Sequence, residues 1–320
     1  MTGNAVVAVV VTYNRRELLE TTLAGITSGD VRPTAIVIVD NASTDETAAF
    51  LGSYAGPVPT DVVRLGKNLG GAGGFVVGME RAVIDHAADY VWIMDDDTEP
   101  HPATLSEALL ASDAYTAGSG EAPSFIASRV VWTDGRDHPM NRMRSRLGAS
   151  EKDRDLAGKV GAVQIRTASF VSVLISAAEI RLHGLPVADY FIWNDDLEYT
   201  ARISRRRNAL SVYASVASHH TKSFGNAGAD PGPRFYYEVR NKVWVYTRSN
   251  ALTPREKLLY SGASIRNWTR TILASKHRKV LLGSLAKGLL HGLRAPRSNG
   301  QVLEGIYELR DVRTSGGAAS

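Results

Sequence analysis

The first hundred residues alternate between short apolar runs and longer stretches with helical spacing. Four runs rich in β-branched residues have the length of buried strands. They cover residues 5–11, 35–39, 62–65 and 90–94. Between them, apolar residues three or four positions apart predict helices from Arg15 to Ile26 and from about Phe75 to Ala87. This alternation predicts an α/β fold in which a mostly parallel sheet is flanked by helices. The segments that follow these strands should therefore gather at one edge of the sheet.

The pattern changes in the second half of the chain. Residues 134–161 are rich in Arg, Asp, Gly and Lys with little periodicity, which predicts an irregular excursion. Another apolar run follows at residues 167–175, and a turn and helix are expected at 193–203. The aromatic-rich segment 235–249 predicts a further helix. Beyond it, leucines recur at helical spacing, namely Leu282, Leu285, Leu289 and Leu293.

The composition is that of an ordinary globular protein of one or two domains, with 44% hydrophobic and 22% charged residues among 320. There are no cysteines, which excludes disulfides, zinc–thiolate sites and thiol catalysis and fits a reducing compartment. No basic segment precedes the first apolar run, so we expect no signal peptide. No apolar run approaches the length that spans a bilayer.

The net charge of +4 is too small to indicate a partner, but its distribution is uneven. Between residues 255 and 297, Glu256 is the only acid. The basic residues there are Arg255, Lys257, Arg266, Arg270, Lys276, Arg278, Lys279, Lys287, Arg294 and Arg297. A basic amphipathic helix can lie on an anionic membrane surface. The alternative is a helix that packs its leucines on the rest of the protein and exposes a solvated basic face; the excess of basic residues favours membrane contact.

Three adjacent carboxylates, Asp95, Asp96 and Asp97, end the fourth apolar run. Like charges at the end of a buried strand repel one another. A divalent cation would offset this repulsion, and carboxylate oxygens suit magnesium or manganese. A cation held there could bind a diphosphate. The alternative interpretation is a solvated acidic turn or a helix N-cap.

A glycine-rich segment, Lys67–Phe75, follows the third predicted strand. Glycines let backbone amides approach phosphates and sugars closely. The segment is neither a Rossmann fingerprint, because Val76 stands where the third glycine is required, nor a Walker A loop. A tight strand-to-helix turn is the simpler explanation. Four glycines in five residues exceed what a turn needs, which favours a binding loop.

Two further groups of polar residues lie downstream. Trp193–Tyr199 contains Asp195, Asp196 and Glu198, and either aspartate could serve as a general base. Helix N-capping by Asn194 or Asp195 would explain the segment equally simply. His219 and His220 follow a short strand pattern, and imidazole is a suitable further ligand for manganese beside carboxylates. A histidine there could instead be structural.

As an ordered set, these segments resemble those of the inverting family-two glycosyltransferases. The resemblance is carried by Val10–Arg15, Val39–Asp45, Asn68–Phe75, the aspartate triplet, Trp193–Tyr199 and the later histidine. It is strongest to the galactofuranosyltransferases of actinobacterial cell-wall galactan synthesis, with bacterial rhamnosyltransferases next. The motifs span roughly residues 5–245. The resemblance implies a GT-A-type nucleotide-sugar-binding fold with a helical C-terminal extension.

The resemblance also implies roles for single residues. Thr12, Arg15 and Asp40 would contact the uridine and diphosphate of the donor. Asn68 and the glycines would lie along the donor; these glycines are Gly70, Gly71, Gly73 and Gly74. Asp95 would sit near the ribose or the metal, Asp96 is the least certain of the donor contacts, and Asp97 would be the firmest metal ligand. His219 is preferred to His220 as a ligand, and Asp196 is preferred to Asp195 as the base.

The implied reaction is inverting, Mn²⁺- or Mg²⁺-dependent transfer of a sugar from a nucleotide-sugar donor. The motifs fit UDP-galactofuranose or dTDP-rhamnose as the donor and a polyprenyl-diphosphate-linked glycan as the acceptor. Residues 1–250 would form the catalytic domain. Residues 251–320 would form a basic helical region that docks a cytoplasmic enzyme peripherally at the inner face of the cell membrane. No motif indicates an oligomeric state.

Two rival functions fit the sequence less well. A haloacid-dehalogenase-type phosphatase needs a threonine four residues after its first aspartate, whereas Thr98 lies three after Asp95. A non-enzymatic basic protein that binds lipid or nucleic acid would leave the acidic cluster without a role. Nucleic acid is not expected as a partner, because that cluster would repel a polyanion.

Overall fold

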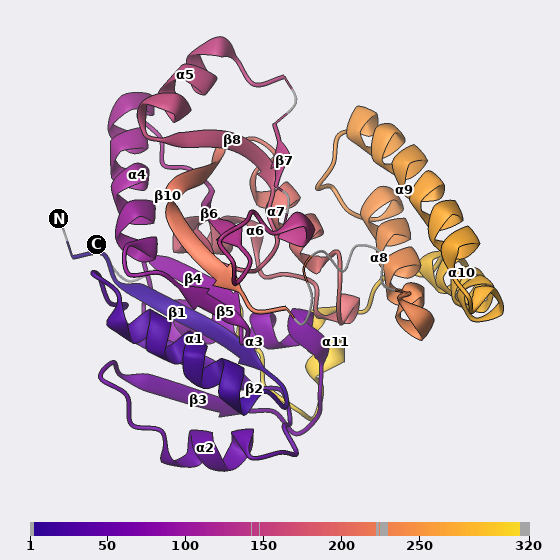
Figure 1. Ribbon diagram of the computed structural model, residues 1–320, viewed down its shortest axis with the longest axis horizontal. Helices are drawn as coiled ribbons and strands as arrows, with labels where there is room; N and C mark the ends of the chain where they lie inside the picture. Colours follow the sequence, from indigo (N-terminus) through magenta and orange to yellow (C-terminus); the bar gives the residue numbers. More distant parts are fainter. Residues whose placement is uncertain (1–2, 142, 147, 222–223, 225–229, 314–320) are drawn as a thin grey trace.

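The computed structural model describes residues 3–141, 143–146, 148–221, 224 and 230–313. Within them, ten strands form one sheet in the order β3-β2-β1-β4-β9-β6-β10-β8-β7, and β5 pairs with β10 (Figure 1). The strands are β1 (Val6–Thr12), β2 (Ala35–Asp40), β3 (Thr60–Arg64), β4 (Tyr90–Asp95), β5 (Thr98–Pro100), β6 (Phe125–Val131), β7 (Arg144–Ser145), β8 (Ala162–Thr167), β9 (Val173–Ser176) and β10 (Ala209–His219). The predicted α/β sheet flanked by helices is confirmed.

The first half of the sheet is parallel and the second half mixes directions. β1 pairs in parallel with β2 and β4, and β2 with β3. β9 enters antiparallel between β4 and β6, while β6 and β10 are again parallel. The four strands predicted in the first hundred residues are all present. The apolar run at 167–175 is not one strand, because β8 ends at Thr167 and β9 begins at Val173.

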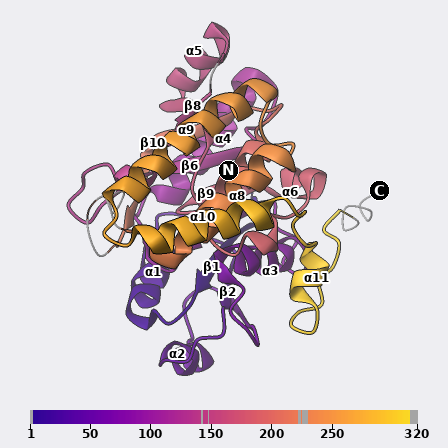
Figure 2. The same cartoon turned by 90° about the vertical axis from the view of Figure 1, so that its right-hand side faces the viewer.

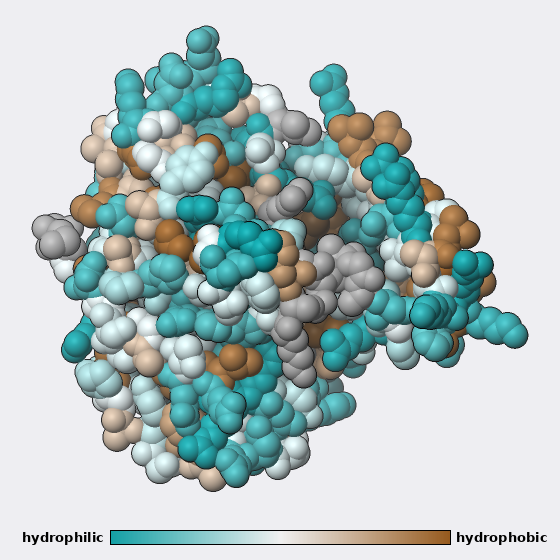
Figure 3. All heavy atoms as spheres, in the orientation of Figure 1, coloured by the Kyte–Doolittle hydropathy of each residue, from teal (hydrophilic) through white to brown (hydrophobic). Residues whose placement is uncertain are grey.

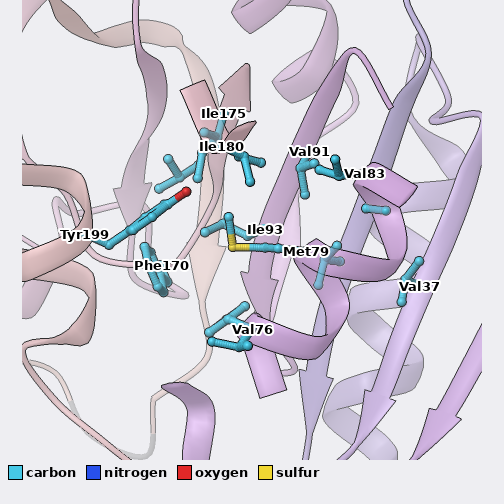
Figure 4. Packing of buried hydrophobic residues seen from close by; sticks show 14 of the residues in the cluster. Val37, Val76, Met79, Val83, Val91, Ile93, Phe170, Ile175, Ile180 and Tyr199 are labelled. Carbon is cyan, nitrogen blue, oxygen red and sulfur yellow. The ribbon is translucent and has the colours of Figure 1, made fainter. Parts of the chain in front are cut away.

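Helices cover both faces of the sheet. They are α1 (Arg16–Ser28), α2 (Thr47–Ser53), α3 (Gly70–Ile84), α4 (Thr104–Ser119), α5 (Glu151–Lys159), α6 (Ala177–His183) and α7 (Asp195–Ile203). β1 shows why two layers are needed, since all seven of its residues are buried. Val7, Val9 and Val11 belong to the cluster that includes residues of α3, α6 and α7. Figure 4 shows part of this cluster, with Met79, Ile180 and Tyr199 from those helices. The alternate residues face α1 and α4. A strand buried on both faces is typical of parallel sheets.

The glycine-rich segment is not a loop, which corrects the sequence-based interpretation. Gly70 begins α3, and the remaining glycines lie in its first turns. Gly70 has a φ of +71°, and a Cβ there would collide with the carbonyl oxygen of Phe191. A Cβ on Gly74 would collide with the side chain of Val11. These two glycines therefore let α3 pack directly against β1 and the chain at Phe191.

Residues 134–161 are also more regular than predicted. They contain a short 3₁₀ helix, η1 (Pro139–Asn141), then β7 and α5. Ser150 caps α5, because its side chain accepts a hydrogen bond from the backbone N–H of Asp153. The prediction of an irregular excursion is wrong for these parts. The sequence did not indicate α5, because this highly charged helix has almost no apolar face.

The C-terminal helices form a separate layer beside the sheet (Figures 1 and 2). They are α8 (Phe235–Thr247), α9 (Pro254–Ala274) and α10 (Arg278–Gly292), whereas the short α11 (Asn299–Leu303) lies against α3. α10 packs against α8 through Leu281, Ser284, Gly288 and Gly292. None of the described helices is both long and apolar enough to cross a bilayer. Residues 314–320 of the predicted C-terminal region lie outside the described residues.

The chain after α11 returns to α3, the helix that packs against β1. The hydroxyl of Tyr307 donates to Glu80 Oε2 at 2.6 Å, and the guanidinium of Arg310 binds both Glu80 and Asp85. Glu80 is fully buried on α3. A buried carboxylate requires such partners, so these bonds tie the end of the described chain to the helix that carries the glycines.

Candidate active site

Three strands bring the predicted donor residues to one edge of the sheet. In the register of the parallel half, Thr12 pairs with Asp40, and Val11 pairs with Asp95. Asp40 in turn pairs with Arg64 at the end of β3. The expectation that the segments after these strands gather at one edge is therefore confirmed. In sheets of this kind, ligands bind at the carboxyl ends of the strands.

Asp96 points back toward β1 and α1. Its Oδ2 accepts a hydrogen bond from Thr12 Oγ1 at 2.9 Å and one from the backbone N–H of Tyr13 at 3.2 Å. Arg15 Nη1 lies 3.2 Å from Asp96 Oδ1 and also donates to Asp97 Oδ2. The guanidinium of Arg15 thus offsets the repulsion within the triplet, a task that the sequence-based interpretation assigned to a metal ion alone.

The three carboxyls differ in acidity. Burial raises the pKa of Asp95, and the charges of Asp97, Asp96 and Asp195 raise it further. Burial also raises the pKa of Asp96 to about 6, against the opposing effect of Arg15. Burial would do the same to Asp97, but hydrogen bonding and charge from His219 and Arg15 outweigh it and lower the pKa. Of the triplet, Asp97 is therefore the carboxylate best held in its ionised form.

Asp97 and His219 form the pair best suited to hold a cation. Asp97 Oδ1 lies 3.2 Å from His219 Nε2 and has no other partner among the described residues. His219 Nδ1 is 2.9 Å from Asn141 Oδ1, so Nδ1 donates to the amide and Nε2 is left as a ligand atom. His220 instead faces Glu99, at 2.7 Å, which agrees with the preference for His219.

The predicted three-ligand set does not appear as a preformed cluster. Across the described ranges, no group of three or more His, Asp or Glu side chains is arranged to hold a metal ion. The pair of Asp97 and His219 still fits a divalent cation, since one atom is a buried, unpartnered carboxylate oxygen and the other an imidazole nitrogen with its tautomer fixed. Such a pair suits an ion that takes its other ligands from substrate phosphates and water.

The acidic segment before α7 is held in an unusual backbone conformation. Phe191, Trp193 and Asn194 all have positive φ, at 64°, 63° and 66°. Non-glycine residues adopt this conformation only where the surroundings enforce it. Here Asn241 of α8 is responsible: its buried amide donates to the carbonyls of Tyr190, Ile192 and Trp193, at 2.9, 2.9 and 2.7 Å.

Neighbouring Arg240 donates to the carbonyls of Asp189 and Tyr190. Arg240 and Asn241 together form a clamp of side-chain hydrogen bonds on the chain before α7. The sequence analysis did not assign a role to Arg240 or Asn241. The only signal in the sequence was the presence of two polar residues within an aromatic-rich helix.

Asp195 and Asp196 face different parts of the site. The charge of Asp195 contributes to the raised pKa of Asp95. Asp196 instead lines a cavity of about 950 Å³ between the sheet and α9. Burial raises the pKa of both carboxyls. Asn194 does not act as the predicted cap, because its side chain makes no cap bond and donates to Glu238 at 2.9 Å instead.

The residues that follow β2 and β3 complete the edge. Asp40 accepts the backbone N–H of Ser43 through Oδ1 at 2.8 Å, while its buried Oδ2 has no hydrogen-bond partner in the described chain. Asn68 Oδ1 accepts the N–H of Gly70 at 2.8 Å and so helps to start α3. Asn41 also holds this start, by bonds to Leu69 and Gly70 that the sequence analysis did not anticipate.

Comparison with known proteins assigns the family. The family model described as "Glycosyl transferase family 2" matches residues 7–171, which is more than half of the chain. The chain belongs to this family. The assignment sets aside the phosphatase and the non-enzymatic protein considered above. The matched segment contains the strand edge and the aspartate triplet, whereas Asp196, His219 and the C-terminal helices of this glycosyltransferase lie beyond it.

Two curated relatives of this glycosyltransferase carry the name galactofuranosyltransferase GlfT1. The protein from Mycolicibacterium smegmatis is 32% identical over 213 residues, which cover 64% of this chain and 67% of the relative. The protein from Mycobacterium tuberculosis is 26% identical over 260 residues, which cover 76% of this chain and 83% of the relative.

Solved structures share the GT-A-type fold. Staphylococcus aureus TarS residues 1–349 in complex with UDP-GlcNAc gives a TM-score of 0.62 at 16% identity, covering 93% of this chain and 82% of that one. The mannosyltransferase PcManGT from Pyrobaculum calidifontis, with GDP-Man and Mn²⁺, gives 0.54 at 18% identity, covering 90% and 75%. The chain spans about half, 54%, of a longer TarS structure. At these identities the likeness concerns the fold.

Proposed function

We propose that this glycosyltransferase moves a galactofuranosyl group from UDP-galactofuranose to a hydroxyl group of a lipid-linked glycan, with inversion at the anomeric carbon. The observation that carries the proposal is that Asp97 pairs with His219 beyond the strand ends while Asp196 lines the wall of a cavity. The relatives named galactofuranosyltransferase favour this sugar over rhamnose from dTDP-rhamnose.

The donor would lie along the carboxyl ends of β1, β2 and β4. The Oδ2 of Asp40 lies 3.6 Å from Arg64 Nε but makes no hydrogen bond with a described residue, so it is suited to accept one from the nucleobase. Arg15 carries a positive charge at the same edge and, with its side chain 48% exposed, is available to a diphosphate. Asn68 and the glycines would act at the N-terminus of α3, where backbone amides favour an anion.

A divalent cation, Mn²⁺ or Mg²⁺, is the proposed cofactor. Asp97 and His219 would hold it, with Asp95 as a further candidate on the same strand end. When bound, the cation would stabilise the negative charge that develops on the departing diphosphate. Arg15, already beside Asp97, would add to that stabilisation and orient the diphosphate.

Asp196 is the proposed general base. Its side chain is partly buried and lines the cavity, and its raised pKa brings its basicity toward that needed near neutral pH. The acceptor hydroxyl would lose its proton to Asp196 and attack the anomeric carbon from the face opposite the nucleotide, which inverts the configuration. Asp195 remains the competing assignment.

We also propose that α9 and α10 place the enzyme at the inner face of the membrane, where a polyprenyl-diphosphate-linked acceptor lies. On α10, Leu282, Leu289 and Leu293 are 51%, 43% and 66% exposed. Brown and teal residues alternate over α9 and α10 at the right of Figure 3. Apolar side chains that project among basic ones suit an anionic lipid surface better than water.

A transfer assay tests the reaction and the cofactor together. With Mn²⁺ and a synthetic lipid-linked acceptor, the protein should consume UDP-galactofuranose and leave dTDP-rhamnose unchanged. EDTA should abolish transfer, and added Mn²⁺ should restore it. Turnover of dTDP-rhamnose alone would replace the proposed donor, and full activity in EDTA would refute the proposed cofactor.

A further inference from the structure

The cavity beside Asp196 has two chemically different walls. Trp193, just before α7, and Asp196, in its first turn, line the side that belongs to the sheet. Arg270 of α9 and Lys276 and His277, from the turn between α9 and α10, line the other side. At about 950 Å³, the cavity is as large as sites that hold small-molecule ligands.

Two acids of the cavity wall, Glu238 and Asp230, form ion pairs or hydrogen bonds with other residues of the chain. Glu238 lies 2.6 Å from Lys242 Nζ and accepts a hydrogen bond from Asn194 at 2.9 Å. Asp230 accepts hydrogen bonds from Ser275 Oγ and from the N–H of Gly232. By contrast, neither Arg270 nor Lys276 makes an ion pair with any described residue. The wall formed by the C-terminal helices therefore carries positive charge that a ligand can neutralise.

Trp193 gives the opposite wall a fixed aromatic surface. Its side chain is 39% exposed, and its backbone, with a φ of 63°, is held by the hydrogen bond from Asn241 to its carbonyl. An aromatic ring that is fixed and open to a cavity offers an apolar face to one side of a sugar ring. Asp196 lines the same wall and is suited to accept a proton from a hydroxyl of that sugar.

We infer that this cavity is the acceptor site and that its ligand is a glycan that carries a phosphate or diphosphate group. The accepting hydroxyl lies at Asp196, the sugar ring against Trp193, and the phosphate at Arg270 and Lys276. The inference rests on the proposed function, because it takes Asp196 as the base. It assigns acceptor selection to α9 and the following turn, which lie outside the family-matched segment 7–171.

A binding titration tests the phosphate subsite separately from transfer. The protein is first saturated with UDP and Mn²⁺, so that the donor site is occupied, and octyl diphosphate is added while tryptophan fluorescence is recorded. We expect saturable binding, with Arg270→Ala and Lys276→Ala each weakening it roughly tenfold or more, because each removes a charged partner of the phosphate. Arg266→Ala is the matched control, since Arg266 is exposed on α9 but does not line the cavity.

Two further probes identify the source of the phosphate. Neutral octyl glucoside should bind at least tenfold more weakly than octyl diphosphate. Inorganic pyrophosphate binding as tightly as octyl diphosphate indicates a soluble phosphorylated acceptor, and tighter binding of the octyl compound indicates a lipid-linked one; both support an anion subsite. No binding of either diphosphate, or equal losses in the Arg266 and Arg270 variants, overturns the inference. Failure of the proposed function is recognised independently, because the wild type would then not bind UDP in the first step.

Discussion

At the residue scale, neighbouring acids of the site point to different partners. Asp96 is hydrogen-bonded to Thr12 on β1, whereas Asp97 turns toward His219 on β10. Asp195 contributes to the raised pKa of Asp95, and Asp196 lines the cavity. Adjacent residues diverge in this way because successive side chains leave the backbone in different directions. Each acid can therefore have a separate function.

Replacing Asp196 by Asn should separate donor binding from turnover. The amide keeps the size of the side chain and can still accept from the N–H of Leu197, but it cannot accept the acceptor proton. We expect kcat to fall by about 10²–10⁴-fold with the Kd for UDP unchanged, as measured by transfer kinetics and calorimetry. If Asp195→Asn loses turnover in this way and Asp196→Asn does not, Asp195 is the base.

The pH dependence of the wild type provides an independent check on the base. Burial raises the pKa of Asp196 to about 6, and only the ionised carboxylate can accept a proton. The kcat/KM for the acceptor should therefore rise with pH through about 6 and then level off. The rising limb should be absent from the residual activity of Asp196→Asn, and its persistence there would assign it to another group.

Asn241 tests whether the clamp on the acidic segment matters for catalysis. Asn241→Ala leaves the carbonyls of Ile192 and Trp193 without their donor and that of Tyr190 with Arg240 alone, which should lower the free energy of unfolding by about 1–3 kcal/mol. Displacement of Asp196 should also lower kcat by on the order of 10²-fold with little change in the KM for the donor. Thr247→Ala, at an exposed position of the same helix, is the control. A loss of stability with normal kcat in the folded variant would make Asn241 purely structural.

At the scale of elements, the glycines at the start of α3 have a packing role that the sequence pattern did not indicate. Glycines after a strand suggested a loop that binds phosphates, yet they form the first turns of a helix pressed against β1. A glycine is required at position 74 because a side chain there would meet Val11 of β1 directly. The helix also brings its N-terminus to the strand edge, so close packing and donor binding are compatible uses of the same residues.

Two alanine substitutions in α3 should have opposite effects on stability. Gly74→Ala would drive a methyl group into Val11 and should cost about 1–3 kcal/mol. At Gly71 the nearest atom to an added Cβ is 3.9 Å away, so Gly71→Ala should stabilise the helix by up to about 1 kcal/mol. Urea denaturation compares the two variants. Equal stabilities would show that contact between α3 and β1 does not require glycine at position 74.

At the scale of the whole molecule, the C-terminal helices pack beside the sheet and leave several of their leucines exposed. α10 presents a face of small residues to α8, which allows close contact, and this turns Leu282, Leu289 and Leu293 outward. The alternative in which these leucines pack on the protein is wrong for those three; Leu285 alone of the predicted stripe packs inward. The outward leucines accompany the basic residues that the sequence analysis linked to a membrane.

Vesicle flotation tests this surface. The protein should float with vesicles that contain phosphatidylglycerol, and added salt should weaken binding because part of the attraction is electrostatic. Leu290→Asp and Leu293→Asp, at positions 60% and 66% exposed, should each reduce binding by roughly tenfold or more. Leu110→Asp, at a 53% exposed position of α4, should bind like the wild type. Equal binding by all four proteins would refute the proposed membrane surface.

The sequence by itself determined the α/β class, the first four strands and the edge at which their polar ends meet. These features follow from local periodicity and from the geometry of parallel strands, in which carboxyl ends share one edge. Charge and motif order in the same way indicated the aspartate triplet and the downstream acids. The sequence pattern did not predict helix α5, because its stability comes from a cap and from contacts with the sheet and not from an apolar stripe of its own.

Only the tertiary structure decided which atoms face one another. The pairing of Arg15 with the triplet, the three hydrogen bonds of Asn241 and the cavity between Asp196 and α9 each join residues at least 48 positions apart. A sequence specifies such contacts only through the complete packing of the chain, because no local preference relates positions so distant. The same reason explains the leucines of α10: their spacing predicted a helix, but the glycines that contact α8 decided which way they point.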